Sequence, residues 1–348
     1  MYLAFANTCI VKIKNLPNNI KDYLIEENIS LHSVPNDSFT PNIVVDFVDP
    51  YPKEIKQLLH PNAFVSQKGF AFHDANNYAI HPDYSFEPNA NIVAEKGISP
   101  IIFWDVLFDH IKLYLLKNKI VTLHAAGINE NGKVSLFFGW DGSGKSSILL
   151  ENLQNNKLFM GDDRIFFSSE GNVYPFFNPI KQFYHELKYY PKFMKNLNPS
   201  KRFFIKISQK INDIDPKHKF NKKLGAIALK VFRKLKLNYV TINVNEFSGV
   251  DTAPGKLNQI FFVNKSSGAS DLDNQIADFT SKIAANVVYA DIQTLNRYYC
   301  ALFSGETQEI DQFENMYENV FKIINNIIAD FKINVIQIDD DTSIENTI

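Results

Sequence analysis

The sequence has little cysteine and lacks any long hydrophobic run. Among its 348 residues only Cys9 and Cys300 are cysteines, and neither has a second Cys or a His at the spacing of metal ligands. No structural zinc site is therefore indicated, and two widely separated cysteines fit a reducing cytosol. The longest apolar candidate, around 101–116, is interrupted by charged residues and falls short of the about 18 apolar residues of a transmembrane helix. The N-terminus lacks the basic start and apolar core of a signal peptide, so we expect a cytoplasmic protein without a membrane partner.

Neither sign of charge is in large excess over the whole chain. The formal net charge is −2 at pH 7, with 45% hydrophobic and 21% charged residues, which is typical of a globular protein. This balance does not indicate a nucleic acid or a membrane as a general partner. The length predicts two domains, or one domain with a large addition.

Residues 1–98 have the pattern of strands joined by turns. Apolar and β-branched runs such as 42–48 are separated by clusters of Pro, Asn and Asp. A hairpin is expected over 69–81 and a short helix at 53–59. We therefore expect a small β-rich N-terminal domain, in which no residue suggests catalysis.

Residues 99–348 are expected to form a second, larger domain. Apolar residues recur at helical spacing over 100–117, with Pro100 near the helix start. A strand at 119–128, a turn with Gly132 at the position of positive φ, and a strand at 133–138 follow. A β-hairpin therefore brings the chain to the motif that comes next.

That motif is Gly139-Trp-Asp-Gly-Ser-Gly-Lys-Ser, which matches the phosphate-loop pattern G-x-x-x-x-G-K-[ST]. The glycines let backbone N–H groups surround phosphate oxygens, Lys145 adds a positive charge, and the Ser146 hydroxyl can reach Mg²⁺. A strand precedes the loop and a helix from about 145 to 154 follows it, which directs a helix N-terminus at the phosphate. The residues expected to contact the nucleotide are Gly139, Asp141, Gly142, Ser143, Gly144, Lys145, Ser146 and Ser147.

An acidic pair follows the loop, since Asp162 lies 17 residues after Lys145 and is followed by Asp163. A helix and a reversing strand fit into that interval and bring the pair back beside the loop. A carboxylate there can bind Mg²⁺ or accept a proton from an attacking hydroxyl. His124, 15 residues before Gly139, is expected to hydrogen-bond the catalytic carboxylate or the phosphate. A polar turn and an ordinary strand histidine are the plain structural alternatives.

The remainder of the chain contains a basic, partly helical insertion at about 181–250. Residues 187–236 hold 15 Lys and Arg against two acids, Asp213 and Asp215. This segment is either a solvated helical addition or an element that docks an acidic peptide, a phosphorylated sugar or, least of all, a nucleic acid. Around it we expect a hairpin at 164–177, strands at 237–244, 256–263 and 332–338, and helices at 224–236, 271–300 and 310–331.

The arrangement of Leu-His-Ala-Ala-Gly, phosphate loop and Gly-Asp-Asp-Arg resembles the HPr kinase/phosphorylase family, whose fold is similar to that of phosphoenolpyruvate carboxykinase. The resemblance implies a mixed α/β fold with a P-loop kinase domain, Lys145 on the ATP phosphates, and Ser146 with Asp163 at Mg²⁺. It also implies Asp162 as the base, itself near the metal, with His124 as its partner; Arg164 follows as a basic residue at the nucleotide. The downstream glycine signature of true HPr enzymes has no counterpart here, so the chain is more similar to stand-alone relatives such as lasso-peptide kinases.

These residues predict an ATP-dependent kinase with Asp162 as base, whose acceptor is a hydroxyl, most simply Ser of a peptide or protein. A kinase for a small hydroxyl metabolite, such as a sugar or nucleoside, is the alternative. A nucleotide-gated binding or regulatory module is the third reading, and the complete set of His124, Lys145, Ser146 and Asp162 argues against it.

Overall fold

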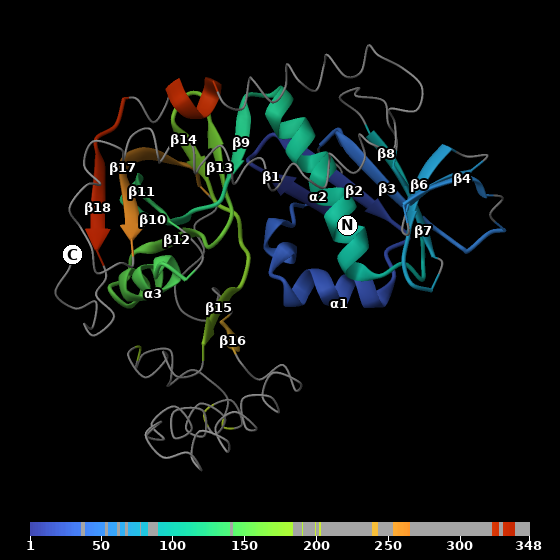
Figure 1. The fold of residues 1–348 in the computed structure, drawn as a ribbon, viewed down its shortest axis with the longest axis horizontal. Coiled ribbons are helices and arrows are strands. Elements are labelled where there is room, and N and C mark those ends of the chain that lie inside the picture. Colours follow the sequence, from blue (N-terminus) through green and yellow to red (C-terminus); the bar gives the residue numbers. More distant parts are fainter. Residues whose placement is uncertain are drawn as a thin grey trace.

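The protein is mixed α/β, with two mixed sheets and few helices in the described part of the chain (Figure 1). Within that part, no helix is long and apolar enough to cross a membrane. The predicted helices at 224–236 and 271–300 lie outside it. The computed structural model describes residues 1–35, 39–52, 55–60, 63–66, 69–76, 78–82, 90–139, 142–183, 190, 199, 202, 239–242, 253–264, 322–326 and 330–337.

The first sheet is built by the N-terminal third of the chain. The β2–β3 and β3–β8 pairs are parallel and the other pairs are antiparallel. In β3, buried and half-buried residues alternate, as expected for a strand with one face in the core. In sheet order its eight strands are β1 (Tyr2–Phe5), β2 (Cys9–Lys14), β3 (Ile43–Val48), β8 (Ala90–Glu95), β7 (Ala79–Pro82), β6 (Gly69–His73), β5 (Ala63–Ser66) and β4 (Ile55–His60).

Two predictions for this region have opposite outcomes. The hairpin over 69–81 is confirmed, since β6 pairs with β7 through Phe72 and Ile80. The helix at 53–59 is wrong, because residues 55–60 form β4 and pair with β5. A six-residue segment is too short to hold a helix by its own hydrogen bonds, whereas strand pairing satisfies its backbone at once.

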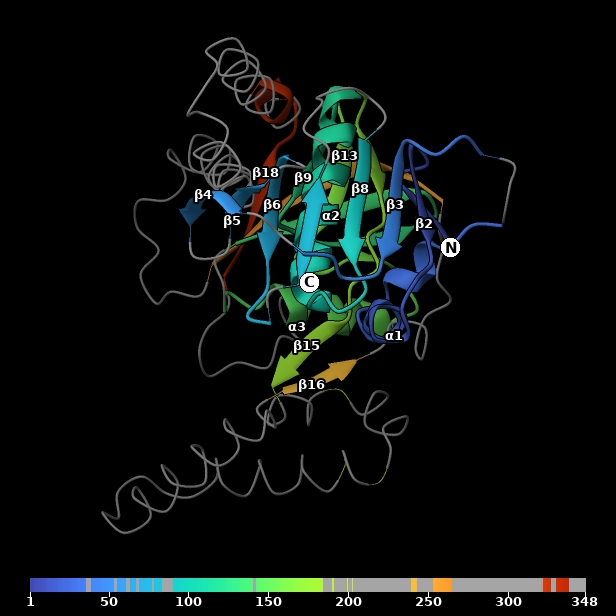
Figure 2. The ribbon, with the colours of Figure 1, turned by 90° about the vertical axis from the view of Figure 1, so that its right-hand side faces the viewer.

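Helices pack beside this sheet and connect it to the rest of the molecule. The loop between β2 and β3 contains α1 (Asn18–Glu26) and the 3-10 helix η1 (Ile29–His32). The predicted helix over 100–117 is confirmed as α2 (Pro100–Lys117), which lies between the two large sheets (Figures 1 and 2). One carboxylate oxygen of Asp74 accepts the N–H of Ser99, at 2.9 Å, and so attaches the start of α2 to the β6–β7 turn.

The second sheet contains β11, the strand that leads into the phosphate loop. The β11–β17 and β17–β18 pairs are parallel and the other pairs are antiparallel. In sheet order the strands are β12 (Leu158–Gly161), β10 (Ala126–Glu130), β11 (Lys133–Phe138), β17 (Gly255–Asn264), β14 (Asn172–Tyr174), β13 (Ile165–Ser168) and β9 (Ile120–Leu123), with β18 (Ile333–Gln337) beside β17.

The segment 119–128 is not the single strand that the sequence predicts. It is divided into β9 and β10, with His124 and Ala125 between them. β9 pairs with β13, whereas β10 pairs with β11 and β12 elsewhere in the sheet. The chain therefore crosses from one part of the sheet to another at His124. The β10–β11 hairpin itself is confirmed, and Gly132 at its turn has a φ of 83°.

The hydrophobic core runs without interruption between the two large sheets. Aromatic rings from both halves meet there: the Phe5 ring lies 6.3 Å from Trp104 and 6.3 Å from Phe166 between centroids, and Phe108 lies 5.3 Å from Phe176. The boundary expected between residues 98 and 99 falls between β8 and α2, and one buried cluster includes residues from both sides of it. The N-terminal third therefore packs directly against the sheet that holds the loop.

Candidate active site

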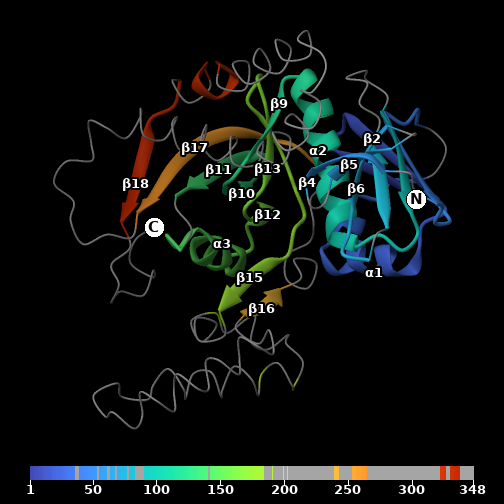
Figure 3. The same ribbon diagram turned by 45° about the vertical axis from the view of Figure 1, so that its right-hand side comes forward.

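The phosphate-loop segment has the predicted order of strand, loop and helix. Strand β11 ends at Phe138 and helix α3 (Lys145–Gln154) begins immediately after the loop, so both predictions are confirmed (Figure 3). Gly142 and Gly144 have φ values of 78° and 100°, which only glycine adopts at little cost. The first N–H groups of a helix have no partner within it and are available to an anion. Asp141, expected at the nucleotide, lies outside the described residues.

Gly139 makes the base of the loop tight. A Cβ on this residue would lie 2.5 Å from the carbonyl oxygen of Val263 and 2.6 Å from Oγ of Ser143, so no larger residue fits without rearrangement. The Ser143 hydroxyl is buried and has no hydrogen-bond partner within the described structure. The ammonium group of Lys145, only 5% exposed as a residue, donates to the Gly139 carbonyl at 2.7 Å. A buried cation and an unpartnered hydroxyl at one glycine loop fit a phosphate group.

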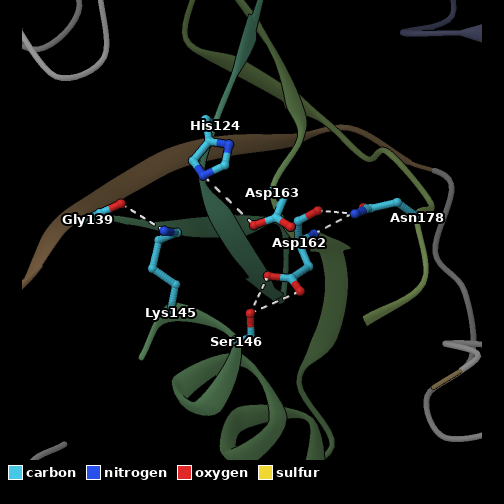
Figure 4. A network of polar contacts seen from close by, with 7 residues as sticks. All are labelled: His124, Gly139, Lys145, Ser146, Asp162, Asp163 and Asn178. Carbon is cyan, nitrogen blue, oxygen red and sulfur yellow. Dashed lines mark hydrogen bonds and ion pairs between the residues drawn. The ribbon is translucent and has the colours of Figure 1, made fainter. Parts of the chain in front are cut away.

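The acidic pair returns to this loop at the end of β12. Ser146, in the first turn of α3, donates its hydroxyl to the two carboxylate oxygens of Asp162, at 3.0 and 3.1 Å (Figure 4). Gly161 permits the turn, because a Cβ there would lie 2.3 Å from the carbonyl oxygen of Arg164. Asp162 is 2% exposed, whereas the Asp163 side chain is 55% exposed and its φ is 65°. The two acids therefore occupy different environments.

Burial changes the acidity of Asp162. Desolvation is the main cause that raises its pKa, and the negative charge of Asp163 raises it further, to about 7. The hydrogen bond from Ser146 and the charge of Lys145 oppose this rise without cancelling it. A carboxyl group whose pKa lies near neutral pH is suited to accept a proton in a reaction and to release it afterwards.

His124 contacts the second acid of the pair. Its Nε2 lies 3.9 Å from Oδ1 of Asp163 (Figure 4). The resemblance assigns His124 to Asp162, whereas this contact is with Asp163. Asp163 has a left-handed backbone, and its side chain points toward His124 between β9 and β10 (Figure 4).

Two of the predicted nucleotide contacts have other neighbours. The guanidinium group of Arg164 lies over the ring of Phe108 in α2, 4.7 Å from its centroid. This contact places the Arg164 side chain beside α2. The main-chain carbonyl of Ser147 accepts a hydrogen bond from the hydroxyl of Tyr190, at 3.2 Å.

The sequence pattern missed Asn178 and Tyr190. Asn178 contacts the main chain of Asp162, and Tyr190 is buried against the first turn of α3. Neither belongs to a motif, so no sequence signal marks them. Tyr190 follows β15 (Ile180–Phe183), which pairs with β16 (Tyr239–Ile242) and packs against α3 (Figure 3). The expected insertion at about 181–250 thus has paired strands near both of its ends, and its basic residues lie mostly outside the described part.

Oxygen ligands for a metal are present at the loop. No group of three or more His, Cys, Asp and Glu side chains that could hold a metal occurs among the described residues. Magnesium that accompanies a nucleotide takes most of its ligands from phosphates and water, and needs one or two oxygens from the protein. The Ser146 hydroxyl and the Asp162 carboxylate, in mutual contact, supply such oxygens.

No protein-family model matches the chain. No curated protein matches it either.

Proposed function

We propose that the protein is an ATP-dependent kinase of the HPr-kinase-like type, which transfers the γ-phosphoryl group to a hydroxyl acceptor with Asp162 as base. The observation that supports this most directly is the contact of Ser146 with both carboxylate oxygens of Asp162. It joins the first turn after a phosphate loop to a buried acid whose pKa is raised to about 7. A donor site and a proton acceptor are thus adjacent.

The donor is held by the loop and the start of α3. Backbone N–H groups from Gly142 to Ser146, the Ser143 hydroxyl and the Lys145 ammonium group bind the phosphates of ATP, helped by the positive end of the helix. Ser146 with Asp162 or Asp163 would hold the cofactor Mg²⁺, which would neutralise negative charge on the phosphates. When ATP binds, the Lys145 ammonium group leaves the Gly139 carbonyl, to which it donates in the structure. It then stabilises the negative charge on the phosphoryl group that is transferred.

The acceptor gives its proton to Asp162. As the acceptor oxygen forms its bond to the γ-phosphorus, the proton moves to the Asp162 carboxylate, and the bond to ADP breaks with its electron pair on ADP. The pKa near 7 leaves a large fraction of Asp162 ionised at neutral pH. The exposed Asp163, paired with His124, lies beside it on the outer side. The resemblance of the motifs to those of stand-alone HPr-kinase-like proteins, such as lasso-peptide kinases, favours Ser of a peptide or protein as the acceptor.

Binding and transfer are tested separately. ATP with Mg²⁺ should raise the melting temperature of the wild type, and Lys145→Ala should remove that shift; an unchanged shift would refute the loop assignment. Labelled ATP is then supplied with separate peptide and metabolite pools, which distinguishes the two acceptor classes. Asp162→Asn should abolish transfer but keep the ATP-induced shift, whereas the matched control Asp163→Asn should retain more activity. ATP binding without transfer to either pool would indicate a regulatory module instead.

A further inference from the structure

The main chain of Asp162 is held by a side chain from outside the loop. The Oδ1 of Asn178 accepts a hydrogen bond from the Asp162 N–H, at 3.3 Å, and its Nδ2–H donates to the Asp162 carbonyl (Figure 4). One amide side chain therefore binds both polar groups of a single residue's backbone. This two-point contact restricts rotation of the main chain about Asp162, and hence the direction of its carboxylate.

The segment around Asn178 lies along the free edge of β12. β12 is a terminal strand of the second sheet and pairs with β10 on its other side. The N–H of Phe176 donates to the Met160 carbonyl, at 2.8 Å, two residues before the Asp162 contact. The contacts at residues 160 and 162 continue the strand spacing of two, since alternate residues of a strand face the same edge. The main chain of Phe176 thus pairs with β12 at Met160, and the side chain of Asn178 continues this pairing at Asp162.

A histidine from the N-terminal third holds this segment in turn. The Phe177 N–H donates to Nε2 of His32, at 3.2 Å, and the imidazole packs against the rings of Phe176 and Phe177. Burial lowers the pKa of His32 to about 3, and a hydrogen bond with the Ala4 backbone opposes this only in part. The imidazole is therefore neutral at physiological pH, and its Nε2 remains an acceptor.

We propose that Asn178 is a positioning residue for Asp162, and that His32 supports it by holding the amide of Phe177. The inference rests on the proposed role of Asp162 as base. It gives the N-terminal third of the chain a part in the site, because His32 in η1 holds Phe177, which lies far from it in the sequence. Both hydrogen bonds of the Asn178 side chain within the described structure go to the main chain of Asp162, not to a glycine of the phosphate loop.

The variant Asn178→Ala separates positioning from donor binding. We expect its kcat for transfer to fall by at least about tenfold, because a small displacement of a catalytic group has effects of that order. Its KM for ATP and its ATP-induced thermal shift should match the wild type. Amide hydrogen exchange over residues 158–164, measured on the ligand-free protein, should become faster. Asn118→Ala is the control, since it removes one exposed amide hydrogen bond at the end of α2.

Two His32 variants test the second contact. His32→Gln places an amide oxygen near the position of Nε2 and should keep both the activity and the slow exchange. His32→Leu removes the acceptor and should behave like Asn178→Ala. If His32→Leu does not fold, Asn178→Ala and His32→Gln still carry the test.

Three results would overturn the proposal. The first is an Asn178→Ala variant with normal kcat and faster exchange, which leaves the kinase assignment standing. The second is a parallel loss of kcat, ATP-induced shift and melting temperature, which indicates a purely structural role. The third is a wild type that protects residues 158–164 from exchange but transfers no phosphate to any acceptor, which overturns the proposed function as well.

Discussion

Replacing Asp162 by Asn should make the ligand-free protein more stable at pH 8, although it removes the proposed base. The folded protein keeps this carboxyl group buried, at 2% exposure, beside the negative charge of Asp163. The unfolded chain exposes the same group to water. Ionisation therefore costs more free energy in the folded state than in the unfolded state, and an amide of nearly the same shape avoids that cost.

The sign and size follow from the two pKa values. Well below the ordinary value of 3.8 the carboxyl group is protonated in both states, so burial of its charge costs nothing. Between the ordinary value of 3.8 and the folded value of about 7, the folded protein binds more protons than the unfolded chain. The free energy of unfolding then decreases by about 1.4 kcal/mol for each pH unit. Above pH 7 the whole difference of about 3 units is present, which corresponds to about 4 kcal/mol.

Urea denaturation of the wild type and Asp162→Asn at pH 4, 6 and 8 measures this difference. The two proteins should have similar stability at pH 4, and the variant should be more stable by a few kcal/mol at pH 8. Asp163→Asn, an exposed neighbour, should show a smaller gain, because it removes only the repulsion. An equal loss of stability in Asp162→Asn at all three pH values would refute the reasoning.

Four further substitutions test the site and the packing of α2 beside the first sheet. Gly139→Ala should destabilise the protein and abolish the ATP-induced thermal shift, because its Cβ would lie 2.5 Å from the Val263 carbonyl oxygen. Tyr190→Phe should lower the free energy of unfolding by about 1 kcal/mol in urea, since it loses the hydrogen bond to the Ser147 carbonyl. Asp74→Ala should cost about 2 to 4 kcal/mol, because three backbone N–H groups lose their acceptor; Asp74→Asn should recover part of the loss in the same assay.

The phosphate loop and its flanking elements could be predicted because their signals are local. A glycine pattern, an apolar run before it and helix-forming residues after it lie within about twenty consecutive residues, and the structure confirms the strand and the helix. The hairpin before the loop depends on one turn at Gly132 and is local too. The helix predicted at 53–59 was wrong for the opposite reason. Residues 55–60 form a strand because they pair with β5, which is not a local signal.

The return of the acidic pair to the loop followed from chain length, but its contacts did not. Spacing alone placed Asp162 and Asp163 near Ser146 and left both acids equivalent. The turn after Gly161 and the left-handed backbone of Asp163 separate them, so that one is buried against Ser146 and the other faces His124. The dihedral angles of this turn depend on the residues that pack around it in the folded protein, and a single sequence does not show which residues those are.

By itself the sequence determined the phosphate loop, the elements on either side of it and the candidate acids and histidine. The tertiary structure decided which acid is buried and where Arg164 lies. It also decided that Asn178 hydrogen-bonds the main chain of Asp162 and that His32 accepts the N–H of Phe177. Local patterns reflect the conformational preferences of neighbouring residues, which the sequence carries directly. Contacts between β12, residues 176–178 and the first sheet depend on how the whole hydrophobic core packs, so they exist only once the chain has folded.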